Sequence, residues 1–432
     1  MIQNLDVYLW NHKVGSLVTY KERYSEKICF YFERGFLDKG YNIAPLQASI
    51  NSVSIKNGLP VYAESEKIFG GLPSFIADSL PDHWGNRVFN EWAKTNGIST
   101  RNLSALDRLA YIGRRGMGAL EFLPPAAEEM EQPFKVEIAE LYKLAKSALN
   151  EAKNFKAEIY PDIMIESLFK VGTSAGGRRP KAIINLNRET NECYSGQVAT
   201  PLPGFIPMII KFDEHSDVPT TRIEYSYYLM AKDAGLNMMQ SYLMEGERTA
   251  HFLTERFDRQ ENKKIHIQTL AAMNPYSNCY EDLFETACRI GILPSEQKQL
   301  FLLMTMNVLG ANVDDHNKNF SFLMGKDGVW HVAPAYDYTF SVAPSAPGYM
   351  NRHSITINNK NSDIERTDLL ELAKRYNIKG ANSIIDKAIA IVGNYEHYAQ
   401  EAGVPPHWIQ KITEEIGYRI EKVKGDSKCF TM

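Results

Sequence analysis

The sequence predicts an α+β fold, with an N-terminal α/β subdomain followed by a larger domain whose last part is mostly helical. Three observations support this. Apolar side chains alternate with a period of two near the N-terminus, strand-like runs and helical spacing follow each other in the middle, and helical patterns dominate beyond residue 280. The length of 432 residues also exceeds that of one ordinary domain.

The first domain is expected to span residues 1–130 and to begin with a β-hairpin. Residues 5–19 alternate between apolar and polar side chains, and His12-Lys13 is the expected turn. Residues 106–125 then predict a helix, a glycine-rich turn and a short strand that ends at a proline pair.

Between the hairpin and this strand, a loop leads into a helix for which Asp82 is the expected N-cap. The apolar stripe of that helix consists of Val88, Phe89, Trp92 and Ala93. This spacing predicts that one face of the helix packs into the core of the first domain.

A linker helix region is expected at residues 131–165 and a second domain at residues 166–432. The second domain opens with strands around a glycine-rich loop at residues 171–181. The next predicted elements are strands at 196–200, 205–213, 240–246 and 249–259, and a helix at 221–236 that ends at a glycine. A helical lobe of about residues 280–432 is interrupted by two strands that flank a Gly325–Gly328 turn.

The composition narrows the class of protein. The formal charge of −4 and the pI near 6.2 give no global reason to expect a nucleic-acid binder. The five cysteines are scattered, which is typical of free thiols in a reducing compartment. Because neither a signal peptide nor a membrane-spanning run is evident, a cytoplasmic location is expected.

The most informative polar stretch follows the apolar run QLFLLMTMNVLGA. Asp314 and Asn319 lie five residues apart in a loop, a hairpin follows at once, and Asp337 comes directly after it. Phosphoryl transfer needs one carboxylate near the acceptor hydroxyl and oxygen ligands that hold Mg²⁺ on the phosphates of ATP. This order is the D-x-x-x-x-N, hairpin, D arrangement of protein kinases. Taken alone, the loop is equally well explained as a solvated turn.

Three upstream features occur in kinase order. A glycine-rich loop could cradle phosphates through its N–H groups and comprises Gly172, Thr173, Ser174, Ala175, Gly176 and Gly177. Lys211 ends an apolar strand, and Glu224 on the next helix could pair with it. Residues of about 252–259 would form the hinge between lobes. Each residue or segment has a plain alternative: the loop is an ordinary turn, Lys211 an edge lysine, Glu224 a surface charge and residues 252–259 an amphipathic strand.

Other chemistries fit the same residues less well. Asp315 and His316 suggest a metal pair, but no further histidine or cysteine lies at zinc-ligand spacing. His316 is expected to hold the loop through a backbone hydrogen bond rather than to act as a general base. No G-x-S-x-G motif supports a serine hydrolase.

The stretches VGTSAGGRRPKAII, IIKFD, ERFDR, DDHNKNFSF and APAYD together resemble the HipA family, the toxin serine/threonine kinases of bacterial toxin–antitoxin systems. The N-terminal stretches VYLWNHKVGSLV, FIADSLPDHWGNRV and LAYIGRRGMGALEF resemble the same family in the same order. The resemblance covers nearly the whole chain and implies a kinase-like second domain that uses ATP and Mg²⁺.

Transferred by position, the resemblance implies that Asp314 is the catalytic base and that Asn319 and Asp337 are Mg²⁺ ligands. Lys211 would contact the phosphates. The other implied ATP-binding positions are the glycine-rich loop, Lys181, Glu224, Glu255, Phe257, His316 and Lys318. The family also phosphorylates itself in the glycine-rich loop, and here that position is Thr173 or Ser174.

The resemblance further implies a growth-arresting toxin that is held by a HipB-like DNA-binding antitoxin, and contacts DNA only through it. Aminoacyl-tRNA synthetases are among the protein targets of the family. Two alternatives stay open: a small-molecule phosphotransferase on a kinase-like fold, and a non-catalytic co-repressor that binds the antitoxin.

The chain departs from the family pattern in three places. Asp315 replaces a small residue and would add negative charge beside the metal. Arg178, Arg179 and Lys181 crowd the phosphate site, so the basic residue that contacts ATP is open. Tyr338 follows the metal aspartate, so the D-F-G switch of eukaryotic kinases is not transferable.

Overall fold

The structure is a computed structural model that describes residues 2–22, 25–65, 69–100, 103–126, 133–150, 179–196, 202–214, 217–246, 249–261, 263–342 and 351–425. It divides into two compact units, each of which is described by itself. The first unit is Met1–Glu214, Leu253–Gln268 and Leu323–Val329, and the second is His215–Phe252, Thr269–Phe322 and Trp330–Met432. The domain boundaries expected at residues 130 and 165 stay a prediction.

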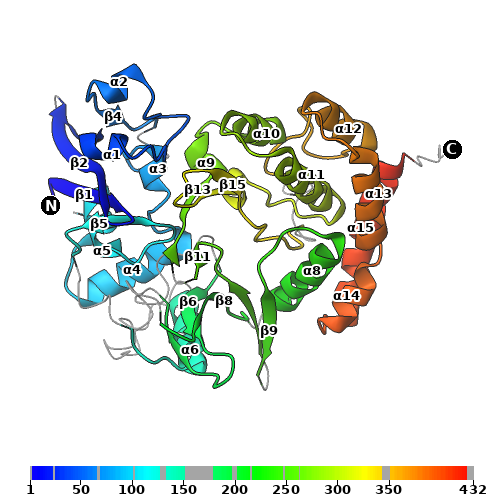
Figure 1. Cartoon of the computed structure of the whole chain (residues 1–432). Helices are drawn as coiled ribbons and strands as arrows, with labels where there is room; N and C mark the ends of the chain where they lie inside the picture. Colours follow the sequence, from blue (N-terminus) through cyan, green and yellow to red (C-terminus); the bar gives the residue numbers. More distant parts are fainter. Residues whose placement is uncertain are drawn as a thin grey trace. The chain divides into compact units, whose positions relative to one another are not determined.

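The first unit contains strands of two larger sheets, the small two-stranded sheet of β11 and β12, and several short helices (Figure 1). Its elements are β1 (Asn4–Leu9), β2 (His12–Glu22), β3 (Ser25–Phe32), α1 (Arg34–Leu37), α2 (Val53–Lys56), β4 (Val61–Tyr62), α3 (Ser74–Ala77), α4 (His83–Thr95), α5 (Ala105–Ile112), β5 (Leu120–Leu123), α6 (Ile138–Asn150), β6 (Lys181–Leu186), β7 (Cys193–Ser195), β8 (Ile206–Lys211), β11 (Arg259–Gln260) and β12 (Lys263–Lys264). The division between the units falls within three strands: β10 (Ala250–Glu255), β13 (His266–Thr269) and β14 (Ser321–Met324).

The first sheet has the strand order β4-β3-β2-β1-β5 and confirms the predicted hairpin. The turn was predicted at the wrong place, however. Leu9 pairs with His12, so the two turn residues are Trp10 and Asn11, with φ angles of 49° and 65°. Two-residue hairpin loops favour this left-handed conformation because it matches the twist of the strands. His12 and Lys13 therefore belong to β2.

Helix α4 confirms the predicted cap and stripe. The Asp82 carboxylate accepts a hydrogen bond from Gly85 N at 2.8 Å, which satisfies one of the free N–H groups of the first turn. All four predicted stripe residues are buried: Val88, Phe89, Trp92 and Ala93. The expected helix, turn and strand of residues 106–125 are present as α5 and β5.

In the second sheet, β6 pairs antiparallel with both β7 and β8, and every residue of β6 is buried. Lys181 and Lys211 lie opposite each other at the ends of β6 and β8. The buried Trp84 Nε1 of α4 donates to the Lys181 carbonyl at 2.8 Å, which fixes β6 against α4 within this unit. The strand expected at residues 196–200 lies outside the described residues except for Gly196.

The second unit is mostly helical, as the sequence predicts beyond residue 280. Its elements are α8 (Thr220–Ala234), β9 (Ser241–Glu245), α9 (Leu270–Met273), α10 (Tyr280–Arg289), α11 (Pro294–Leu309), the 3₁₀ helix η3 (Asn317–Asn319), β15 (Trp330–Val332), α12 (Arg366–Arg375), α13 (Ala381–Val392), α14 (Tyr395–Glu401) and α15 (Pro406–Lys424). Gly235 ends α8 with a φ of 77°, which confirms the predicted C-cap.

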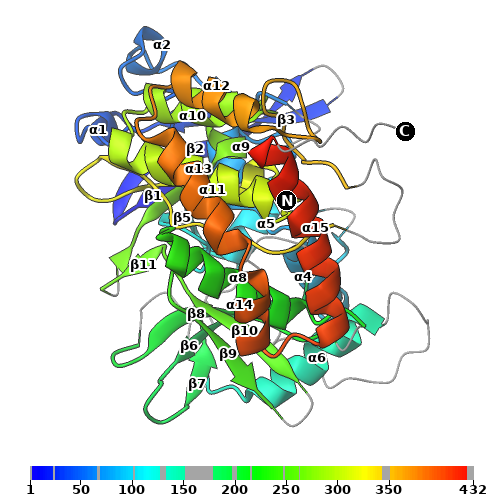
Figure 2. The ribbon, with the colours of Figure 1, turned by 90° about the vertical axis from the view of Figure 1, so that its right-hand side faces the viewer.

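Helix α11 is the centre of this unit. It packs against α10, α13 and α15, and all of its residues from Leu300 to Leu309 are buried. Helix α15 also contacts α12 and α14 and runs along one side of the bundle (Figure 2). The apolar run that precedes the polar loop is thus a core helix, and burial on all sides explains its lack of a polar face.

The turn between β14 and β15 is the predicted one, because Gly328 N donates to the Gly325 carbonyl at 3.0 Å. Among the described residues, no helix combines the length and the apolar character that crossing a membrane requires.

Candidate active site

The polar loop begins at a fixed point, the C-terminus of α11. The last carbonyls of a helix lack partners inside the helix. Here the Tyr338 hydroxyl donates to the Met306 carbonyl at 3.1 Å, and the Tyr227 hydroxyl donates to the Gly310 carbonyl. A Cβ at Gly310 would lie 2.6 Å from the Tyr338 oxygen, so this close approach requires glycine. The end of α11 therefore positions the loop that follows.

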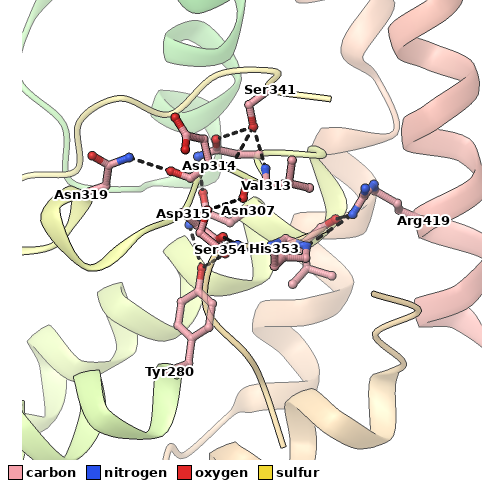
Figure 3. Close-up of polar contacts among 12 residues, drawn as sticks. Tyr280, Asn307, Val313, Asp314, Asp315, Asn319, Ser341, His353, Ser354 and Arg419 are labelled. Carbon is pink, nitrogen blue, oxygen red and sulfur yellow. Dashed lines mark hydrogen bonds and ion pairs between the residues drawn. The ribbon is translucent and has the colours of Figure 1, made fainter. Parts of the chain in front are cut away.

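The main chain around Asp314 is hydrogen-bonded on every side (Figure 3). Ser341 Oγ accepts from the N–H groups of Val313 and Asp314, at 2.7 and 2.9 Å. Ser354 donates its N–H and its hydroxyl to the Val313 carbonyl, both at 3.0 Å. Asn319 Nδ2 donates to the Asp314 carbonyl at 2.8 Å. The loop backbone is thus held, while the Asp314 side chain is exposed and its carboxylate has no partner among the described residues.

Asn319 is brought to Asp314 as predicted. It ends η3, and its own N–H donates to the His316 carbonyl at 2.8 Å. Because its side-chain nitrogen is committed to Asp314, its oxygen is left as an acceptor with no partner in the described part of the chain. Lys318 is exposed, and its carbonyl accepts from the Tyr336 hydroxyl at 2.7 Å.

His316 holds the loop through its main chain and not through its ring Nδ1. Its ring does not hold the loop through Nδ1, because that atom is buried and has no hydrogen-bond partner among the described residues. The main chain of His316 does the holding instead, through its carbonyl and Asn319 N.

Asp337 lies in a segment that shares polar contacts with the loop. Asn312 Nδ2 approaches the Asp337 carbonyl at 3.5 Å, and Asn312 Oδ1 accepts from Ser341 Oγ at 3.2 Å. Asp337 has a φ of 50°, a left-handed conformation that non-glycine residues adopt at an energetic cost and that is concentrated at functional sites. The ligand roles of Asn319 and Asp337 stay a prediction.

Asp315 does not add a free charge to the loop, contrary to expectation. Its carboxylate is buried and points away from the exposed side of the loop (Figure 3). It accepts hydrogen bonds from the Tyr280 hydroxyl at 2.7 Å, from His353 Nδ1 at 2.8 Å and from Ser354 N at 2.8 Å. Burial, and then the charge of Asp315, raise the pKa of Tyr280 well above its usual value, so its hydroxyl remains a donor.

The other predicted residues are distributed over both units. Lys181, Lys211, Glu255 and Phe257 belong to the first unit, at the ends of β6, β8 and β10. Glu224 belongs to the second, on α8, and is buried at 4% exposure, so it is not a plain surface charge. The pairing of Lys211 with Glu224 stays a prediction.

The glycine-rich loop Gly172–Gly177, with Thr173 and Ser174, lies outside the described residues, as does Arg178.

Sequence reasoning missed the residues that support the loop: Tyr280, Asn307, Asn312, Ser341, His353 and Ser354. For one of them, the sequence contains a pattern that could have predicted its role. Asn307 is a polar residue within the apolar run of α11, and a buried amide needs partners. Tyr280, Ser341, His353 and Ser354 act across 27 to 41 residues of sequence, which no local spacing reveals.

Comparisons with known proteins identify the family. A family profile described as "HipA-like C-terminal domain" matches residues 173–423, and one described as "HipA N-terminal domain" matches residues 5–123. No curated protein matches the chain.

Among solved structures, the Shewanella oneidensis MR-1 toxin–antitoxin complex of HipA, HipB and its operator DNA aligns over 98% of this chain and 97% of that chain. The TM-score is 0.66 and the identity is 16%, which makes this a likeness of fold. The Helicobacter pylori proinflammatory kinase CtkA aligns over 51% of this chain and 89% of that chain, with a TM-score of 0.35 and 13% identity. The predicted fold class is confirmed: an α+β chain whose C-terminal region is kinase-like.

Proposed function

Because the chain belongs to the HipA family, we propose that it is an ATP-dependent serine/threonine protein kinase that serves as the toxin of a toxin–antitoxin pair. One observation carries the proposal: Asp314 presents an exposed carboxylate on a loop whose main chain is hydrogen-bonded on every side. A fixed carboxylate that can take a proton from an incoming hydroxyl is what a kinase needs as its base.

The neighbouring oxygen donors fit Mg²⁺ bound with a nucleotide. The described residues contain no cluster of three or more His, Cys, Asp or Glu side chains around one point. Mg²⁺ in such enzymes takes only one or two carboxylates from the protein, together with phosphate oxygens and water. The Asn319 side-chain oxygen and the Asp337 carboxylate would be the ligands. A bound Mg²⁺ would offset negative charge on the phosphates.

The remaining roles follow the family pattern. Lys211 would contact the phosphates with Glu224 as its partner, and Glu255 and Phe257 would contact the adenine. Autophosphorylation at Thr173 or Ser174 would add about −1.5 to −2 charges beside the phosphate site and switch the kinase off. A HipB-like antitoxin would restrain the toxin and link it to DNA, as in the complex from Shewanella oneidensis. The protein target would be an aminoacyl-tRNA synthetase.

The test is transfer of label from [γ-³²P]ATP with Mg²⁺ to proteins of a bacterial extract. Replacing Asp314 by Asn keeps the shape of the side chain but removes the base, and losing a positioned base costs on the order of 10²–10⁴-fold in rate. The matched control is Asp363→Asn, an exposed carboxylate of the same unit whose partners include the Tyr418 hydroxyl and Lys422.

The expected result is labelled protein with the parent and with Asp363→Asn, and almost none with Asp314→Asn. Equal transfer by Asp314→Asn would contradict the assignment of the base. Label found only in the small-molecule fraction would favour a small-molecule phosphotransferase instead.

A further inference from the structure

We infer that Asp315 and His353 are positioning residues that fix the Asp314 carboxylate from the buried side of the loop. The inference rests on the proposed function, because it assigns a role in the same site. It begins from the chain itself: residues 314 and 315 are neighbours, one side chain is exposed and the other is fully buried. Because the two residues share a peptide bond, anchoring the Asp315 side chain constrains the direction in which the Asp314 side chain points.

Among the described residues, the anchor of Asp315 contains no arginine or lysine. Its two oxygens accept from Tyr280, His353 and Ser354 N, all at 2.7 to 2.8 Å. An ionised carboxylate in a buried site is tolerated when several donors point at it. Because no arginine or lysine contributes to these contacts, the stabilisation of Asp315 depends on how the three donors are directed. This makes the site sensitive to small displacements of Asp315.

The protonation of His353 follows from its two neighbours. Its Nε2 lies 3.3 Å from Arg419 Nη1, and a guanidinium can only donate. Nε2 must then accept, so the ring proton sits on Nδ1 and is donated to Asp315 at 2.8 Å. The ring thus connects the Asp315 carboxylate to Arg419 on α15. Arg419 is held in turn by Glu415 at 2.8 Å.

The two anchors of the loop belong to one hydrogen-bonded chain (Figure 3). The Tyr280 hydroxyl donates to Asp315 and accepts from Asn307 Nδ2 at 3.0 Å. Asn307 Oδ1 accepts from Asn312 Nδ2 at 3.0 Å, and Asn312 Oδ1 accepts from Ser341. Ser341 holds the N–H groups of residues 313 and 314. A change at Asp315 therefore reaches Asp314 from both directions.

The test compares Asp315→Asn and Tyr280→Phe with the parent. Asparagine turns an N–H₂ group toward donors, so residue 315 must move, and a displacement of about 1 Å costs on the order of 10²-fold in rate. We expect kcat to fall by about that factor while KM for ATP stays unchanged. Tyr280→Phe removes one donor of the network and should lower kcat about tenfold. The matched control is Tyr418→Phe, which removes a hydroxyl bound to the exposed Asp363.

Hydrogen–deuterium exchange of the peptide that contains residues 312–316 is measured on the same proteins, because it does not depend on activity. Faster exchange in Asp315→Asn and Tyr280→Phe, with the control unchanged, supports the inference. Parent-like kcat and parent-like exchange in Asp315→Asn would overturn it, and so would a rise of KM for ATP with kcat retained. If the parent itself transfers no phosphate, the proposed kinase function fails, while the exchange result still decides whether Asp315 fixes the loop.

Discussion

Two buried aspartates, one in each unit, are stabilised in opposite ways. Asp258 in the first unit accepts from Arg256 Nε and Nη2 at 2.9 and 2.8 Å, from Arg259 Nη1 at 2.7 Å and from Gly118 N at 2.7 Å. Asp315 in the second unit accepts from a tyrosine, a histidine and one backbone N–H. Both carboxylates are fully buried. Two arginines contact the first, whereas a tyrosine, a histidine and a backbone N–H contact the second.

This difference matches what each aspartate does. Although burial opposes ionisation, Arg256 and Arg259 hold the pKa of Asp258 well below its usual range. Burial lowers the pKa of Arg259 to about 10, so it also remains charged at neutral pH. Asp258 ties the turn at Gly118 to residues 256–259, which is a structural connection within the first unit. Asp315 instead lies next to the candidate base, Asp314, and we infer that it fixes that residue.

The largest effect is therefore expected from Asp258→Ala, and it should be an effect on stability. The substitution leaves two buried guanidinium groups without their counter-charge, which typically costs about 3–5 kcal/mol. The measurement is the free energy of unfolding from urea titration. Glu192→Ala is the matched control, because it removes a carboxylate that is also paired with a cation, Lys135 at 2.9 Å, but is exposed.

The urea midpoint of the control should stay close to that of the parent. A small loss of stability in Asp258→Ala would mean that the two arginines find other partners or water, and the contrast with Asp315 would then disappear.

Most of the fold follows from local sequence patterns. The capped helix α4 and the Gly235 end of α8 depend on residues within a few positions of each other, which periodicity and capping rules describe. The error at the first hairpin has a local cause as well. The dipeptide Trp10-Asn11 adopts the left-handed turn, whereas tryptophan is not a usual turn signal.

The candidate site could be predicted only in part. The D-x-x-x-x-N spacing gave Asp314 and Asn319, and the structure joins them by a direct hydrogen bond. The support from Tyr280 and His353 could not be found this way, because it comes from residues 35 and 38 positions from Asp315. Their proximity depends on how the helices of the second unit pack, and no single-sequence pattern encodes that packing.

Mild acid should lower the free energy of unfolding through His266, a buried histidine of the first unit. Burial lowers the pKa of His266 to about 4, whereas an unfolded histidine titrates near pH 6.5. Between these two pH values the histidine binds a proton in the unfolded chain but not in the folded chain. The free energy of unfolding should therefore fall as the pH drops below 6.5, and the loss should reach about 2 kcal/mol at pH 5. Below about pH 4 the contribution of His266 to this loss should stop growing.

The measurement is urea unfolding of the parent and of His266→Gln at pH 7 and pH 5, with His12→Gln on the half-exposed hairpin as the control. His266→Gln should lose this part of the pH dependence, and His12→Gln should keep it. Asp258 should not contribute in this range, because its pKa lies well below it. An undiminished pH dependence in His266→Gln would assign the acid sensitivity to other groups.

The smallest effect is expected from Ser341→Ala, which tests the other anchor of the Asp314 loop. The substitution removes the acceptor of two N–H groups, but Asp314 is exposed, so water can replace part of the contact. A typical hydrogen bond contributes about 1 kcal/mol, equivalent to a several-fold change in rate. We expect kcat of the labelled-ATP reaction to fall several-fold, less than in Asp315→Asn, with Ser16→Ala of the first sheet at the parent rate. A larger loss in Ser341→Ala than in Asp315→Asn would make Ser341 the dominant anchor and reverse the order of the two supports.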